Sequence, residues 1–187
     1  MGKGLVEKLK REFSIQDEWV SYELRPETPP EGIPLTRRFS PEDLHRIYEN
    51  LRRTGEPLGI IFGEVKVTSN SRSALQAVEF ARDRGHFHSF HNRVFYAYFT
   101  DTRDIGNVEV LLDLAQEDGL DPAELQRALA EGTYLSRLFH ARRDADALGV
   151  TAVPTFVVDG THKIVGAPSP DLFRKRLAEV QSQVRPG

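Results

Sequence analysis

Apolar side chains recur every three to four residues along most of this chain, which is the spacing of one face of an α-helix. Near the N-terminus, Leu5, Val6, Leu9 and Phe13 follow this spacing and predict an amphipathic helix over residues 3–13. The same spacing, bounded by capping residues and glycines, predicts further helices near residues 41–54, 70–85, 87–98, 107–117, 122–131 and 133–148. The middle of the chain is therefore predicted to be entirely helical.

Alternation of side chains with a period of two, which is typical of β-strands, occurs near the two ends of the chain. Residues 19–24 alternate in this way until Pro26 ends the run. After Gly149, residues 151–158 and 161–165 flank Asp159-Gly160, a two-residue sequence that favours a tight β-hairpin. A last helix is predicted to begin at Ser169-Pro170. This order of elements predicts an α/β fold.

The composition of the chain narrows the class of protein. Its 187 residues, 39% of them hydrophobic, are enough for about one domain with a buried core. The chain has 25 basic and 28 acidic residues, so its net charge is −3. This charge gives no strong electrostatic field that would recruit nucleic acid or an anionic membrane. The apolar runs, such as 58–62 and 152–158, are too short to span a bilayer. We expect a cytoplasmic protein, because the N-terminus lacks the apolar region of a secretory signal.

The residues give little support for a thiol, metal, serine-nucleophile or cofactor site. The absence of cysteine excludes disulfides, thiolate metal sites and cysteine nucleophiles. His86, His88 and His91 cluster, but a helix places only the last two on one face and no further ligands complete a set. The pattern favours exposed histidines at a helix start and no metal site. No serine elbow, phosphate loop or dinucleotide fingerprint is present, so no catalytic residue and no cofactor are predicted.

The aromatic residues of this region are interpreted as packing groups. Trp19 alternates away from Val20 and is expected to be buried against a neighbouring helix. The aromatic side chains of the helix near 87–98 are expected to lie mostly in the core; they are Phe95, Tyr96, Tyr98 and Phe99.

Pro154 is unusual because it interrupts the run Val-Pro-Thr-Phe at the start of the predicted hairpin. A proline cannot donate a backbone hydrogen bond to a sheet, so it must lie at the beginning or the edge of a strand. Two forms fit the sequence: an ordinary trans proline, or a cis proline that leaves the preceding backbone free to meet another chain.

Several segments together resemble the DsbA-like branch of the thioredoxin superfamily, and within it the cytoplasmic FrnE-like group of thiol–disulfide oxidoreductases. These segments are 70–72, 87–99, 103–106, 148–156 and 166–170. The resemblance implies a thioredoxin-like core built from residues 1–34 and 149–187, with a mainly helical insertion over residues 35–148. It also implies that Pro154 is cis, and that Val153 and Pro154 bind a protein or peptide substrate through the Val153 backbone.

The chain departs from that family pattern at its beginning. Family members carry a Cys-Pro-x-Cys motif where the first, central strand meets the first helix, followed by a pair that resembles Gly2-Lys3. The resemblance thus implies that the strand and both cysteines precede Met1, which would be an internal methionine of a truncated sequence. The family activity is exchange or isomerisation of protein disulfides, and the chain as printed is expected to be inactive because it has no cysteine.

Two other functions stay open from the sequence. Kappa-class glutathione transferases and 2-hydroxychromene-2-carboxylate isomerases resemble the same architecture, but they tend to have serine before the cis proline and Gly-x-Asp-Arg after the hairpin. This chain has Val153 and Gly166-Ala167-Pro168-Ser169 at those places. The third alternative is a peptide-binding module without catalysis. Exposed sheet edges would also allow two copies to pair as a homodimer.

Overall fold

The computed structural model describes residues 2–184, and the side chains of residues 2–180. The helices are α1 (Gly2–Leu9), α2 (Pro41–Gly55), α3 (Arg72–Asp83), α4 (Phe87–Phe99), α5 (Val108–Glu117), α6 (Pro122–Glu131), α7 (Leu135–Ala147) and α8 (Pro170–Val184). Short 3-10 helices, η1 (Leu35–Arg37) and η2 (Glu56–Leu58), flank α2. Strand β1 (Ile33–Pro34) pairs with β2 (Val67–Thr68), and β3 (Thr155–Val158) pairs with β4 (His162–Val165), both antiparallel. Every predicted helix is present, although the first ends at Leu9 rather than Phe13.

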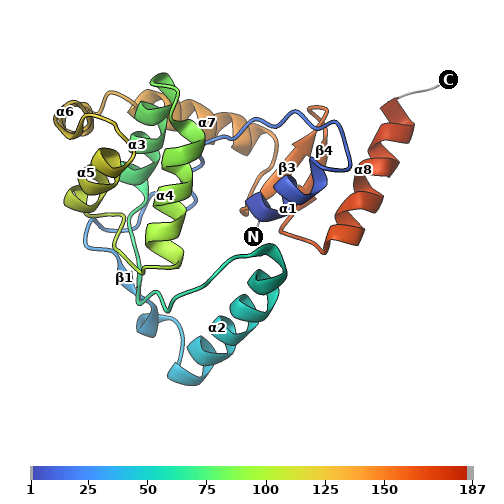
Figure 1. The fold of residues 1–187 in the computed structure, drawn as a ribbon, viewed down its shortest axis with the longest axis horizontal. Coiled ribbons are helices and arrows are strands. Elements are labelled where there is room, and N and C mark those ends of the chain that lie inside the picture. The colour runs from blue at the N-terminus through green and yellow to red at the C-terminus, as the bar shows by residue number, and fades with distance from the viewer. Residues whose placement is uncertain (1, 185–187) are drawn as a thin grey trace.

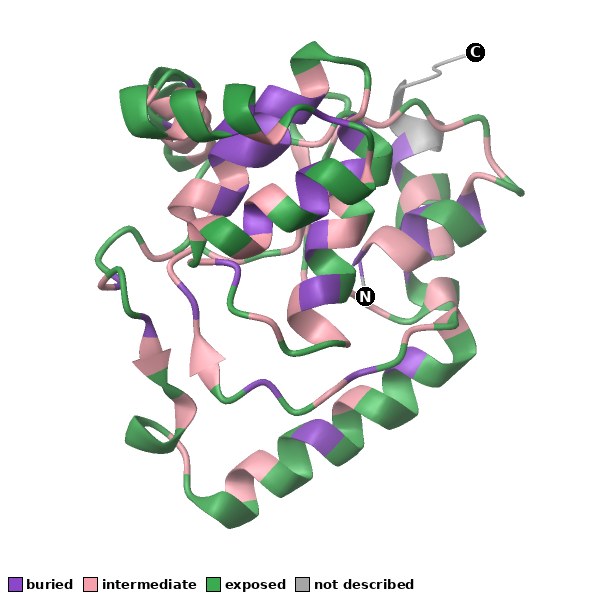
Figure 2. Cartoon of the chain, turned by 60° about the vertical axis from the view of Figure 1, so that its left-hand side comes forward, coloured by how far each residue is buried: buried purple, intermediate pink, exposed green. Residues whose placement is uncertain are grey.

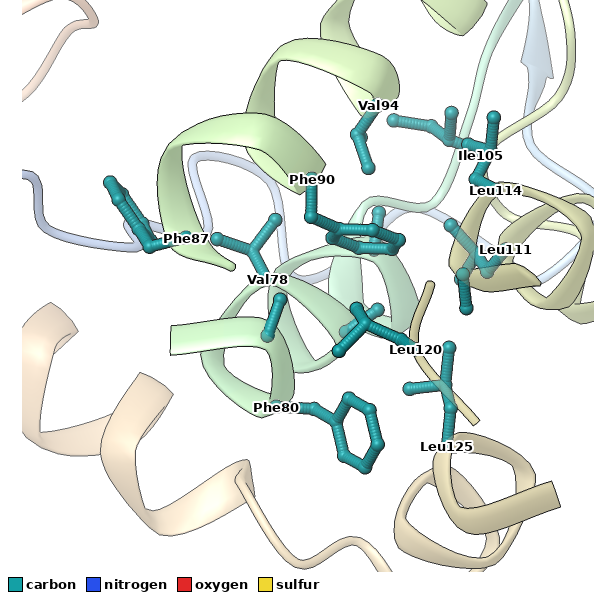
Figure 3. Packing of buried hydrophobic residues seen from close by; sticks show 14 of the residues in the cluster. Val78, Phe80, Phe87, Phe90, Val94, Ile105, Leu111, Leu114, Leu120 and Leu125 are labelled. Atoms are coloured by element: carbon teal, nitrogen blue, oxygen red, sulfur yellow. The ribbon is translucent and has the colours of Figure 1, made fainter. Parts of the chain in front are cut away.

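The main core lies among helices α3 to α6, with Phe80, Phe90, Leu111 and Leu125 almost completely buried. Figure 3 shows the ring of Phe90 in the centre of this cluster. Local sequence sets the ends of these helices. The Asp121 side chain, for example, accepts hydrogen bonds from the first free backbone N–H groups of α6. This core makes a rigid support for the surfaces of α3 and α4.

A second core joins the two ends of the chain. Leu5 and Leu9 of α1 and Phe173 of α8 are buried together. Both helices lie beside the β3–β4 hairpin (Figure 1). The ring of Phe156 in β3 packs on that of Phe173, with centroids 4.7 Å apart. Trp19 contacts both cores. This packing holds the first turn of α1 against the hairpin.

Helix α2 projects from the rest of the structure and is mostly exposed (Figure 2). It begins at a capping box in which the backbone N–H of Asp43 donates to Ser40 Oγ and Ser40 donates back to the Asp43 carboxylate. Of its residues, only Tyr48 and Gly55 are buried. The Tyr48 hydroxyl donates to the backbone carbonyl of Val65, which attaches the helix to the segment that follows it.

Residues 19–24 do not form the predicted strand; within the described part of the chain they pair with no other strand. Their carbonyls accept hydrogen bonds from side chains instead: Arg82 of α3 donates to Trp19 O at 2.7 Å, and Arg142 of α7 donates to Glu23 O at 2.8 Å. Ser21 and Glu23 are buried while Val20 is 60% exposed. The period of two therefore reflects a polar contact with α3, because Ser21 donates to Glu79 and Glu23 pairs with Arg72.

Replacing Arg82 with methionine should lower the free energy of unfolding by about 2 kcal/mol, because a charged donor is removed from both Trp19 O and the buried Glu79 carboxylate. Chemical denaturation measures this difference. Arg143→Met is the matched control, since Arg143 is exposed and pairs only with Asp144 among the described residues. Equal effects of the two substitutions would show that the Arg82 contacts do not attach residues 19–24.

The hairpin and the middle of the chain also differ from the predictions. The first hairpin strand begins at Thr155 rather than at residue 151, because Pro154 lacks an N–H and the Thr155 hydroxyl donates to the carbonyl of Ala152. The middle is not entirely helical, since β1 and β2 pair there over two residues each. No helix in the described residues is long and apolar enough to span a bilayer.

Candidate functional site

The two residues predicted to bind substrate, Val153 and Pro154, lie together at the entrance to β3. The peptide bond between them is cis, which is one of the two forms that the sequence allowed. The Pro154 carbonyl accepts a hydrogen bond of 2.7 Å from the backbone N–H of Gly166, beyond the end of β4. The Val153 side chain is half exposed, at 50%. The hairpin thus holds this turn in place and presents Val153 at the surface.

One edge of β3 is unpaired. The strand pairs with β4 through Thr155 to Val158, and no other strand of the described chain lies beside it. An edge of this kind presents backbone N–H and C=O groups that can pair with another extended chain. Val157 in the same strand is also partly exposed, at 37%. Backbone groups and branched apolar side chains are therefore available at the same edge.

The first turn of α1 connects this edge to two other parts of the structure. A Cβ atom on Gly2 would lie 3.1 Å from Pro154 Cβ and 3.3 Å from Phe156 Cζ. A Cβ atom on Gly4 would lie 3.4 Å from side-chain atoms of Leu58 and Ile60, in the segment after α2. Lys3 donates from Nζ to the side-chain oxygen of Asn92 in α4. Both glycines thus allow α1 to approach its neighbours closely.

Helix α4 carries a row of rings at four-residue spacing: Phe87, His91, Phe95 and Phe99. The His91 ring stacks on Phe87, with centroids 5.3 Å apart and planes 16° apart, and lies 4.5 Å from the Phe95 centroid. The Trp19 ring also contacts the His91 ring, with centroids 5.4 Å apart. Burial, with the positive charge of nearby Lys3 as a smaller contribution, lowers the pKa of His91 to about 4. His91 is therefore a neutral, mainly packing group at neutral pH.

The three clustered histidines have three different environments. His86 lies 3.2 Å from the Asp118 carboxylate through Nδ1, and His88 is exposed. The interpretation of all three as exposed histidines was wrong for His91, because the rings on both neighbouring turns of α4 cover it. No group of three or more potential metal ligands occurs in the part of the chain that the structure describes.

Exposed apolar side chains occur on the elements that the first turn of α1 contacts. Phe95 is 45% exposed and Ile61 is 70% exposed, and the Thr100 hydroxyl at the end of α4 donates to the Ile61 carbonyl.

The prediction that the aromatic residues of α4 lie mostly in the core was wrong for Phe95 and Tyr96. Trp19 is only partly buried. The four-residue spacing of aromatic rings in the sequence was the signal that could have identified the aromatic row of α4.

Burial lowers the pKa of Lys3, although Glu7 acts in the opposite direction. The chain contains no cysteine, so its own residues supply no thiolate for attack on a disulfide. What Val153, the β3 edge and the α4 rings can provide is backbone hydrogen bonding beside apolar contact surface.

Comparisons with known proteins agree with this architecture. Residues 2–178 match the family described as DSBA-like thioredoxin domain. YwbO, an uncharacterised protein of Bacillus subtilis, is 32% identical over 189 residues, which cover 98% of this chain and 91% of YwbO.

Three solved structures share the fold. A probable DsbA oxidoreductase from Streptomyces coelicolor has a TM-score of 0.86 at 22% identity, and the match covers 100% of this chain and 86% of that one. A putative protein disulfide isomerase from Nitrosomonas europaea has a TM-score of 0.68 at 16% identity, covering 97% and 91%. A 2-hydroxychromene-2-carboxylate isomerase has a TM-score of 0.69 at 18% identity, covering 98% and 92%. At these identities the likeness concerns the fold alone.

Proposed function

Since this chain belongs to the family of DsbA-like thioredoxin domains, we propose that it binds extended segments of other proteins along the free edge of β3, beside Val153 and Pro154. The observation that carries the proposal is the unpaired edge of β3 next to a half-exposed Val153. Extended peptides bind such edges by adding a strand, with main-chain hydrogen bonds providing affinity and side-chain contacts providing selectivity.

The surface around the edge favours apolar segments. Val153, Phe95 and Ile61 are exposed on elements that meet at the first turn of α1. Burying such side chains against an apolar partner removes hydrophobic surface from water, at roughly 25 cal/mol per Å². An unfolded polypeptide exposes apolar residues that a folded protein hides, so it fits this surface better than a folded surface does.

The proposed partners are proteins that undergo disulfide exchange. We base this on the family and on two structures with a similar fold, which are named a probable DsbA oxidoreductase and a putative protein disulfide isomerase. For the sequence as it stands we propose substrate binding without exchange, because exchange requires an attacking thiolate and this chain has none.

Binding of the S-carboxymethylated B chain of insulin, an extended polypeptide without free thiols, tests the proposal by fluorescence anisotropy. Val153→Glu should weaken binding by about tenfold, because it removes an apolar contact and places a charge at the edge. Phe139→Glu is the matched control, since Phe139 is 59% exposed on α7 and takes no part in the site.

Equal binding by the two variants would exclude the β3 edge as the peptide site. Reduced glutathione is the competitor in the same assay. Displacement of the peptide by glutathione at millimolar concentration would favour the glutathione-dependent alternative over polypeptide binding.

A further inference from the structure

The pairing of β3 with β4 uses the backbone groups of only alternate residues. In an antiparallel pair, residues that exchange hydrogen bonds with the partner strand alternate with residues that do not. Pro154 belongs to the first kind, because its carbonyl accepts from the backbone N–H of Gly166. In the observed register Phe156 bonds β4 in the same way. The residues between and beyond, Thr155 and Val157, therefore point their N–H and C=O groups to the free edge.

The proline at the start of this strand does not interrupt the free edge. The carbonyl of Pro154 points to β4, so the N–H that a proline lacks is missing on the β4 side. Thr155 and Val157 each keep both a donor and an acceptor at the free edge, and no other strand of the described chain pairs with them. An extended segment can thus form a regular ladder of hydrogen bonds with these two residues.

The side chains of the same two residues lie on the outer face of the hairpin, which we define by Thr155, Val157, Lys163 and Val165. Thr155 lies opposite Val165, and Val157 lies opposite Lys163. Residues directly opposite each other share a face of the sheet. Val165 is 63% exposed, whereas Phe156 on the other face packs in the second core. A bound segment therefore extends a face made mainly of β-branched side chains.

On the basis of the proposed function, we propose that the backbone groups of Thr155 and Val157 bind the partner, and that the partner is a segment with β-branched apolar side chains at alternate positions. Every second side chain of a bound strand lies on the outer face. β-Branched side chains fit there because they are stiff and pack well against similar neighbours. Such segments are typical of half-buried strands in folded proteins, so they become accessible when a protein is unfolded.

Amide hydrogen exchange followed by NMR, with and without the S-carboxymethylated insulin B chain, tests the hydrogen bonds in the intact chain. Without peptide, the amides of Thr155 and Val157 should exchange faster than that of Phe156, which donates to β4. Saturating B chain should slow both by about tenfold or more, because their N–H groups become bonded. The amides of Lys163 and Val165 point to the far edge of the hairpin and should not change.

The outcomes separate this inference from the proposed function. Bound B chain that leaves the exchange of Thr155 and Val157 unchanged, or that slows Lys163 and Val165 equally, overturns the assignment of these backbone groups. If Val153→Glu still weakens binding in that case, the peptide site stands and only its hydrogen-bonding groups are wrong. Failure of the native chain to bind the B chain contradicts both proposals.

Two short synthetic peptides of identical composition test the choice of side chains. In one peptide valine alternates with serine, and in the other all valines precede the serines. The alternating peptide should bind about tenfold more tightly in fluorescence anisotropy, because it alone places valine at every position on the outer face. Val157→Ser should reduce this difference, whereas Leu172→Ser, at a residue 45% exposed on α8, should leave it unchanged. Equal affinity of the native chain for both peptides contradicts the proposed partner class.

Discussion

Replacing Phe90 with alanine is expected to lower the free energy of unfolding by about 3–5 kcal/mol. The side chain is completely buried in the centre of the α3–α6 core (Figure 3), so truncation removes its transfer free energy and leaves a cavity that the surrounding helices fill only in part. Because the net stability of a domain is about 5–15 kcal/mol, the variant should be folded at room temperature with little margin. Urea denaturation followed by circular dichroism measures the change.

Tyr96→Ala is the control for this prediction, since Tyr96 lies on the same helix and is 57% exposed. It should change the free energy of unfolding by less than about 0.5 kcal/mol. Equal destabilisation by both substitutions would show that burial in the core is not its cause, and helix propensity would not explain it either, because alanine favours a helix more than phenylalanine or tyrosine does. A small effect of Phe90→Ala alone would show that the α3–α6 core is not packed around this ring.

Acidification is expected to destabilise the chain through His91. The folded protein holds its pKa at about 4, below the ordinary value of 6.5, mainly because the ring is buried. As the pH falls below 6.5 the unfolded chain therefore takes up a proton that the folded chain does not, and stability falls until about pH 4. Each tenfold difference in proton affinity is worth about 1.4 kcal/mol, so the full loss is about 3 kcal/mol, of which about 2 kcal/mol occurs between about pH 7 and pH 5.

His91→Phe removes the titration and retains a ring in the aromatic row, so its free energy of unfolding should fall much less over the same pH interval. Tyr96→Ala is the control, since Tyr96 is exposed on the same helix and is not one of the rings that contact His91. It should leave the pH dependence of the native chain unchanged. An identical pH dependence for the native chain and His91→Phe would show that His91 is not held neutral on folding.

A further loss of stability is expected at lower pH from carboxylates. Burial opposes ionisation of Asp118, but hydrogen bonds from Arg93, Ser89 and His86 outweigh it and lower its pKa. The stability from this group is present above the ordinary carboxylate pKa and is lost as the pH falls below it. Measurements above about pH 5 therefore separate the contribution of His91 from that of Asp118.

Most of the helices could be predicted from the sequence because a helix is determined by near neighbours. The turn at Asp121-Pro122, for instance, contains both a cap and a favourable first residue. The segment from Val153 to Phe156 was also recognisable, together with the family that it indicated. The FrnE-like group, the division into residues 1–34, 35–148 and 149–187, and the cytoplasmic location remain predictions.

The strand predicted over residues 19–24 shows why other features could not be read from the chain. A period of two reports that alternate side chains face different surroundings, but it does not say what those surroundings are. Here Ser21 and Glu23 face inward because Glu79 and Arg72 of α3 meet them, more than 45 residues away in sequence. Such a long-range polar contact has no local pattern, so the same alternation that usually indicates a β-strand occurred without one.

The sequence by itself determined the positions of the helices, the turn at Val153 and Pro154, and the absence of a thiol from this chain. Only the tertiary structure decided which surfaces are available: the free edge of β3, the burial of His91 and the exposure of Phe95. The physical reason is how far apart along the chain the determining contacts are. Backbone conformation follows from contacts over a few residues, whereas burial depends on which distant segments pack against a side chain.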